Sequence, residues 1–168
     1  MVKNPGLLPG KQSLRDGDVG KRKKEIREIM DGCWRSCIEP GNGDNEDDDP
    51  EDHESFKPFV ADAIIANPPG FSHVHCAEKL GIPFHLMFTM PWSPTQAFPH
   101  PLANVHSTST DPSVANFLSY PIVTMLTFQG LGGIINDFRE HVLGLEPVSI
   151  IWTPYLVSTA KVPFTYCW

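Results

Sequence analysis

Several motifs that would point directly to a known reaction are missing from this sequence. It contains no G-x-G-x-x-G, no G-x-x-x-x-G-K-S/T, no H-E-x-x-H and no G-x-S-x-G. These motifs form dinucleotide and phosphate loops, zinc-protease helices and hydrolase nucleophile elbows. The sequence therefore gives no basis for predicting any of these sites, and no catalytic residue or cofactor is predicted.

Cysteine is also scarce, with four in 168 residues, and no basic stretch followed by an apolar run opens the chain. Both features argue against a secreted, disulfide-held scaffold, so we expect a cytosolic protein. Cys33 and Cys37 lie four residues apart on the apolar face of an expected helix. We interpret them as small core residues, because a disulfide within one helix has poor geometry.

Charge of one sign is concentrated in a single segment. The net charge is −7, but residues 44–54 hold eight of the 20 acids, and without them 13 cations face 12 acids. We expect a disordered acidic insertion at 44–57. Most cations precede residue 36 and alternate with acids rather than forming one basic face, so we expect no nucleic-acid partner.

Residues 112–136 carry no charged side chain at all. A membrane span has to be weighed for such a stretch, but Pro121, several glycines and polar residues interrupt it. We favour buried helices over a span. A peripheral contact with a membrane stays open.

In the rest of the sequence, short apolar runs alternate with segments whose apolar residues have helical spacing. Helical spacing predicts a helix over 18–38, and short apolar runs at 59–67 and 82–90 predict two strands. Between them, 71–80 has one apolar helical face. Strand, helix and strand in this order predict a βαβ unit with a parallel sheet.

After this unit the sequence is rich in proline. Five prolines between 91 and 112 predict an ordered loop or a lid. A helix kinked near Pro121 should follow, be broken by the glycines at 130–133, and give way to a second helix ending at Gly144. Two apolar runs, 148–152 and 162–168, complete the chain.

One cluster, His73-Val74-His75-Cys76, has the composition of a metal site. Zinc needs three or four ligands around one point, and no second pair at the required spacing is present. On a helix, His73 and Cys76 would share a face while His75 would point elsewhere. We favour packed residues over a metal site.

A resemblance adds to this reading. The segment FVADAIIANPPGFSHVHCAEKLGIPFHLMFTMPWSPTQAFPHPLAN resembles the fungal sterol 3-beta-glucosyltransferases, as do GLGGIINDFREHVLGLEPVS, PFTYCW, VKNPGL and GCWRSCIE. The resemblance implies an α/β fold, a Rossmann-like parallel sheet with flanking helices. It further implies that residues 1–168 form part of the N-terminal, acceptor-binding half of a two-domain GT-B glycosyltransferase.

In that family the resemblance implies transfer of glucose from UDP-glucose to the 3-hydroxyl of a sterol. It also implies a glycine-rich first turn and a C-terminal UDP-sugar domain, neither of which this sequence contains. We therefore expect a fragment that binds a sterol acceptor, would meet UDP-glucose only through the missing domain, and is inactive alone. The alternative is a non-catalytic lipid-binding or sterol-binding interaction module derived from the same fold.

The loop that leaves the second strand supplies candidate residues for the acceptor. Ligands of open α/β sheets bind beyond the carboxyl ends of the strands, where this loop starts. Its aromatic side chains could provide flat apolar surface, and its histidine could meet the sterol hydroxyl. Simple packing of the loop onto the helices is the alternative. The candidate acceptor-binding residues are Met90, Trp92, Phe98, His100, Phe117 and Tyr120.

Overall fold

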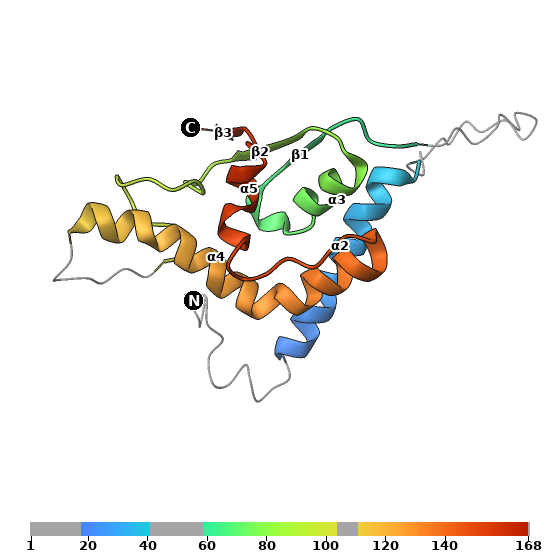
Figure 1. The fold of residues 1–168 in the computed structure, drawn as a ribbon, viewed down its shortest axis with the longest axis horizontal. Helices are drawn as coiled ribbons and strands as arrows, with labels where there is room; N and C mark the ends of the chain where they lie inside the picture. Colours follow the sequence, from blue (N-terminus) through green and yellow to red (C-terminus); the bar gives the residue numbers. More distant parts are fainter. Residues whose placement is uncertain (1–17, 41–58, 104–110, 168) are drawn as a thin grey trace, which may run out of the picture.

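A computed structural model of the chain describes residues 18–40, 59–103 and 111–167. Helices and three short strands alternate along them (Figure 1). The acidic insertion expected at 44–57 lies outside the described residues, as does 104–110 of the proline-rich segment. Residues 91–103 of that segment contain no helix or strand, as predicted.

The three strands form one parallel sheet. Strands β1 (Ile64–Ala66), β2 (Phe84–Phe88) and β3 (Phe164–Tyr166) lie in the order β1-β2-β3. Helix α3 (His73–Leu80) connects β1 to β2, preceded by a short 3-10 turn, η1 (Pro68–Gly70). The predicted βαβ unit is confirmed, although both strands are shorter than predicted.

Helix α2 (Asp18–Ile38) has the predicted bounds. Its apolar face contributes Met30 and Cys37 to the core, where they meet side chains of α3, α4 and the segment after α4. Cys33 and Cys37 are free thiols, as expected. The Sγ atom of Cys33 lies 3.7 Å from Nε2 of His73, which ties α2 to α3.

The predicted break at the glycines is wrong, because α4 (Pro112–Asp137) runs through all three of them and also through Pro121. Gly132 is buried, and a Cβ atom there would lie 2.8 Å from the Phe128 ring. A glycine at this point lets the ring lie against the helix backbone, so packing outweighs the low helix propensity.

A π-helical segment, η2 (Phe138–Leu143), continues α4 and ends at Gly144, where a left-handed φ of 62° suits glycine. Gly144 is the predicted end of this helix. Residues 148–152 form no strand, and two short turns follow, η3 (Thr153–Tyr155) and α5 (Leu156–Thr159).

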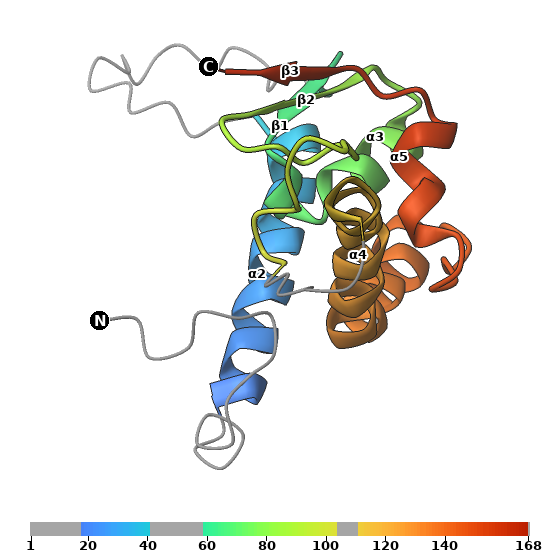
Figure 2. The same cartoon turned by 90° about the vertical axis from the view of Figure 1, so that its left-hand side faces the viewer.

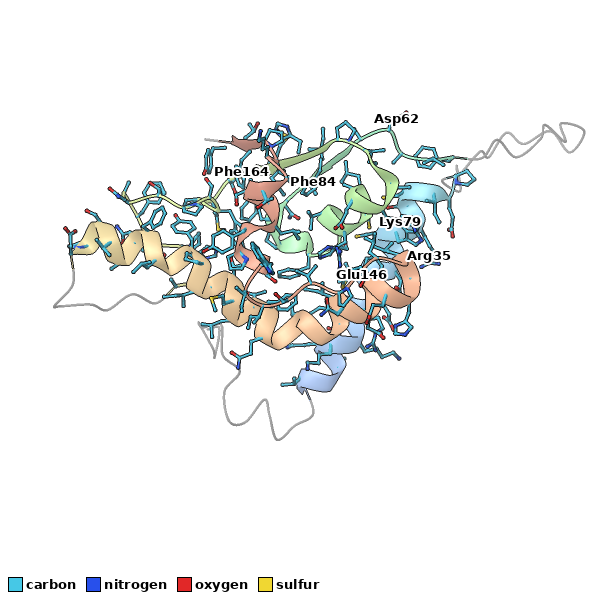
Figure 3. The ribbon with its side chains drawn as sticks, viewed as in Figure 1. Arg35, Asp62, Lys79, Phe84, Glu146 and Phe164 are labelled. Carbon is cyan, nitrogen blue, oxygen red and sulfur yellow. The ribbon has the colours of Figure 1, made fainter. Side chains whose placement is uncertain are left out.

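The helices of the described residues cover one face of the sheet and leave the other open (Figure 2). Ile64 and Leu86 point to the covered face and are buried, whereas Ile65 and Met87 on the other face are 68% and 39% exposed. Phe84 and Phe164 lie on the neighbouring strands β2 and β3 (Figure 3), where Phe164 pairs with Leu86. Parallel sheets are usually covered on both faces, so the described part of the chain forms half of the usual layered arrangement.

Candidate functional site

The candidate acceptor site begins where β2 ends. Four aromatic side chains form a continuous row from the last residue of β2 to the middle of α4. The ring of Phe88 lies 5.3 Å from that of Trp92, Trp92 lies 4.4 Å from His100, and His100 lies 5.3 Å from Tyr120. All three contacts are edge-on, the geometry that ring quadrupoles favour. The row therefore brings together three of the six candidate residues, Trp92, His100 and Tyr120.

Hydrogen bonds fasten the loop to the first half of α4. The backbone N–H of His100 donates to Oγ of Ser119 at 2.7 Å, and Nδ2 of Asn116 donates to the carbonyl of Gln96 at 2.9 Å. The hydroxyl of Tyr120 donates to the Phe98 carbonyl at 3.3 Å. The polar residues of α4 thus face the loop and give it a fixed place despite its lack of regular structure.

His100 and Tyr120 are the most enclosed members of the row, each with 2% of its surface exposed. Burial lowers the pKa of His100 to about 4, so the imidazole is neutral at pH 7. Its Nδ1 accepts a hydrogen bond from the backbone N–H of Leu102 at 3.1 Å, which assigns the ring proton to Nε2. A base this weak suits hydrogen bonding better than removal of a proton from an alcohol.

The other three candidates lie on the surface beside this row. Met90, Phe98 and Phe117 are 46%, 41% and 45% exposed. Phe117 lies one helical turn before Tyr120, and Phe98 supplies the carbonyl that the Tyr120 hydroxyl meets. The candidates therefore divide into a packed row and an exposed apolar border.

Two further residues belong to this region and were not predicted. The backbone N–H of Cys167 donates to the Phe88 carbonyl at 3.0 Å, so the end of β3 lies beside the start of the loop. Tyr166 pairs with Phe88 in the register of β2 and β3, so it lies at the same edge of the sheet. The pKa of Tyr120 is raised mainly by burial, and the charge of Tyr166 adds to this shift. The position of Tyr166 at the end of a strand is the only sequence signal that could have indicated it.

The structure gives His75 a different environment from a metal site. Its Nδ1 lies 2.8 Å from Nη1 of Arg139. The same guanidinium also donates two hydrogen bonds to the Glu78 carboxylate, at 2.6 Å from Nη1 and 3.1 Å from Nη2. Nε of Arg139 donates to the Glu146 carbonyl at 2.7 Å, and Glu146 lies near the end of η2 (Figure 3). Among the described residues, no three His, Cys, Asp or Glu side chains are grouped to hold a metal ion.

The pKa of His75 is lowered to about 4, first by burial and then by the Arg139 charge, with Glu78 opposing them. His75 is therefore neutral and accepts the guanidinium hydrogen bond. Arg139 is only 4% exposed, and its contacts join α3 to η2. This cluster, His75 with Glu78 and Arg139, is a polar connection within the fold, in which His75 and Arg139 are buried and Glu78 is partly exposed.

A parallel βαβ sheet with helices on one face and an aromatic row at its carboxyl edge defines a Rossmann-like α/β protein. No family model matches the chain. One sterol 3-beta-glucosyltransferase of Arabidopsis thaliana is 40% identical over 168 residues, which is 100% of this chain and 24% of that protein. A second from the same plant is 39% identical over 172 residues, covering 100% of this chain and 23% of its own length.

A fungal relative from Komagataella phaffii, also a sterol 3-beta-glucosyltransferase, is 36% identical over 164 residues, 95% of this chain and 11% of its own length. Sterol 3-beta-glucosyltransferases are therefore similar to this chain over 95% or more of its length, which confirms the resemblance seen in the sequence. It spans about a quarter or less of the length of these curated relatives.

Proposed function

We propose that this chain forms the sterol-binding side of a glucosyltransferase that uses UDP-glucose. The observation that carries the proposal is the aromatic row from Phe88 to Tyr120 at the carboxyl edge of the sheet, bordered by exposed apolar side chains. Ligands of open α/β sheets bind at this edge. The relatives named above are sterol glucosyltransferases, and a sterol suits an apolar surface of this kind.

The chemistry of the acceptor agrees with this surface. A sterol is a flat hydrocarbon with one hydroxyl, so its affinity comes mainly from apolar area, at roughly 25 cal/mol per Å² removed from water. The exposed rings of Phe98 and Phe117 provide that area. His100 is the neutral hydrogen-bond partner that we assign to the hydroxyl.

Replacing Trp92 by alanine tests the site. We expect the dissociation constant for a fluorescent sterol, supplied from cyclodextrin, to rise roughly tenfold or more, because an aromatic contact contributes about 1.5 to 3 kcal/mol. Trp92→Phe should recover most of the affinity, because it keeps a flat ring. The matched control is Trp152→Ala, since Trp152 is 68% exposed and lies outside the aromatic row.

A folded Trp92→Ala protein with unchanged sterol affinity would reject the site. If Trp92→Ala lowers both the sterol affinity and the melting temperature, and Trp92→Phe does not restore the affinity, the ring only packs the loop. In the full-length enzyme the same change should raise the sterol KM and leave the UDP-glucose KM nearly unchanged.

We also expect the 168-residue polypeptide to bind sterol without transferring glucose. Transfer needs a base at the hydroxyl and groups that stabilise the departing diphosphate, and the sequence contains none of the phosphate-binding motifs. The measurement is incorporation of radiolabelled glucose from UDP-glucose into ergosterol or cholesterol. Incorporation that depends on sterol and exceeds the protein-free blank would contradict this expectation.

A further inference from the structure

Hydrogen bonds hold His100 at both its backbone and its ring. Its backbone N–H donates to Oγ of Ser119 at 2.7 Å, and its carbonyl accepts from the N–H of Ala103 at 2.8 Å. The second bond closes a β-turn that begins at His100, with Pro101 at the second position, where its fixed φ suits the turn. Within this turn, Nδ1 of the ring accepts the N–H of Leu102 at 3.1 Å. The turn therefore orients the imidazole as well as the backbone.

This turn decides which nitrogen of the ring carries the proton. A neutral imidazole has one N–H and one nitrogen that accepts, and the Leu102 N–H requires Nδ1 to be the acceptor. Burial keeps the ring neutral at pH 7, because it lowers the pKa of His100 to about 4. Nε2 therefore carries the proton, and the ring can offer a ligand a donor but no acceptor.

The Nε2–H group of His100 has no hydrogen-bond partner among the described residues. In this part of the chain, Nδ1 of His73 is the only buried side-chain nitrogen or oxygen without a partner, so Nε2 of His100 is not sealed inside the protein. The neighbouring rings of Trp92 and Tyr120 surround it with apolar surface, and the Tyr120 hydroxyl already donates to the Phe98 carbonyl. A donor in such surroundings favours a ligand that supplies an oxygen, because an apolar ligand removes its water without replacing the hydrogen bond.

We propose that the site recognises the oxygen of a sterol only as a hydrogen-bond acceptor, and that it therefore binds sterol ketones as well as sterols. The inference rests on the proposed function, because it concerns the same site. A hydroxyl oxygen and a carbonyl oxygen both have lone pairs for the Nε2–H group of His100, whereas a hydrocarbon without oxygen has none. A ketone has no O–H group to receive glucose, so it occupies the site as a ligand that cannot react.

Three saturated steroids that differ at a single carbon test this inference: cholestanol with a hydroxyl, cholestanone with a carbonyl, and cholestane with neither. Each is supplied from cyclodextrin to the 168-residue chain and competes with a fluorescent sterol. We expect the dissociation constants of cholestanone and cholestanol to agree within about threefold, and that of cholestane to be roughly tenfold higher, because cholestane leaves the N–H unpaired. If the ring instead accepted the hydroxyl proton, cholestanol would bind about tenfold more tightly than cholestanone, and the proposal would be wrong.

His100→Asn separates the donor from the turn. The asparagine oxygen can accept the Leu102 N–H in place of Nδ1, but this side chain is too short to place a donor where Nε2 lies. We expect the variant to bind all three steroids with dissociation constants within about threefold of one another. His141→Asn is the matched control, because the side chain of His141 is 74% exposed and lies outside the aromatic row, and it should keep the preference for an oxygen. Each comparison is made between ligands on one protein, so a general loss of affinity does not affect it.

The proton on the ring can also be located without a ligand. Long-range proton–nitrogen NMR spectra distinguish a protonated ring nitrogen from an unprotonated one, and the spectrum of His100→Asn identifies the His100 signals by their loss. We expect Nε2 to be protonated and Nδ1 to be unprotonated at pH 7. A proton on Nδ1 would overturn the proposal even if all three steroids bind as expected.

The outcomes distinguish this inference from the proposed function. If cholestane binds as tightly as cholestanol while Trp92→Ala weakens the binding of both, the sterol site stands and recognition through His100 is wrong. If none of the three steroids binds the unchanged chain, the proposed function fails and this inference fails with it.

Discussion

Arg139→Ala should lower the free energy of unfolding by about 3 kcal/mol or more, because it removes the central donor of a buried network. The guanidinium reaches His75, Glu78 and the Glu146 carbonyl together, and its side chain is only 4% exposed. Its loss leaves His75 Nδ1 and the Glu146 carbonyl without these hydrogen bonds and opens a cavity between α3 and η2. The Glu78 side chain is 43% exposed, so water can restore part of its solvation.

Urea unfolding followed by circular dichroism measures this loss. Arg27→Ala is the matched control, because Arg27 and Asp137 form a 3.4 Å ion pair with side chains 52% and 48% exposed. Exposed pairs contribute about 0 to 1 kcal/mol, so this control should differ little from the unchanged chain. Arg139→Lys should not rescue stability, because one ammonium cannot reproduce the guanidinium fork. A loss in Arg139→Ala as small as in Arg27→Ala would show that the network does not hold α3 to η2.

This network illustrates what the sequence could not reveal. Arg139 and Glu78 are 61 residues apart, and neither position carries a local signal of pairing. In the sequence, His75 looked like a packed residue or a metal ligand, because only its neighbours were visible. The buried position of Arg139 depends on how η2 packs against α3, which is a property of the tertiary structure.

The sequence predicted helices and strands correctly where a single hydrophobic periodicity dominated a segment. The helical spacing from 18 to 38 gave both ends of α2, and two apolar runs around a short helix gave the parallel βαβ unit. The glycines misled because low helix propensity is a local property, whereas α4 is also held by the core packing of Phe128, Ile134 and Ile135, which local sequence does not show. Helix propensity is a weak prior that tertiary contacts can reverse.

The candidate site was partly predictable for a similar reason. The strand order placed the loop that follows β2 at the carboxyl edge, and proline and aromatic content marked it as ordered. The contact of His100 with both Trp92 and Tyr120 depends on bonds from α4 side chains such as Ser119, which have no pattern of their own. Hydropathy also could not tell which face of α4 is exposed, because its polar side chains Asn116 and Ser119 face the loop, whereas the apolar Ile122 is exposed.

Acid should destabilise the chain well before its carboxylates are protonated. The pKa values of His75 and His100 are lowered from 6.5 to about 4, mainly by burial, so both histidines are neutral in the folded chain. The unfolded chain takes up their protons below about pH 6.5, whereas the folded chain resists until about pH 4. Their stabilisation is therefore complete above pH 6.5 and is lost as the pH falls toward 4. Each histidine should lower the free energy of unfolding by about 1.4 kcal/mol per pH unit within this window.

Urea titrations at successive pH values, with a double variant, can assign this slope to the two histidines. In His75→Asn with His100→Asn, the amide oxygen can replace Nδ1 as acceptor for Arg139 and for the Leu102 N–H, yet asparagine does not titrate. The double variant should lose most of the pH dependence between 6.5 and 4. It should keep the contribution of His73, whose pKa burial also lowers, and the loss at lower pH, where protonation of Glu78 weakens its pairing with Arg139. His141→Asn is the control, because the side chain of His141 is 74% exposed. An unchanged slope in the double variant would show that neither burial site keeps its histidine neutral, and His100 would lose its assignment as a neutral hydrogen-bond partner.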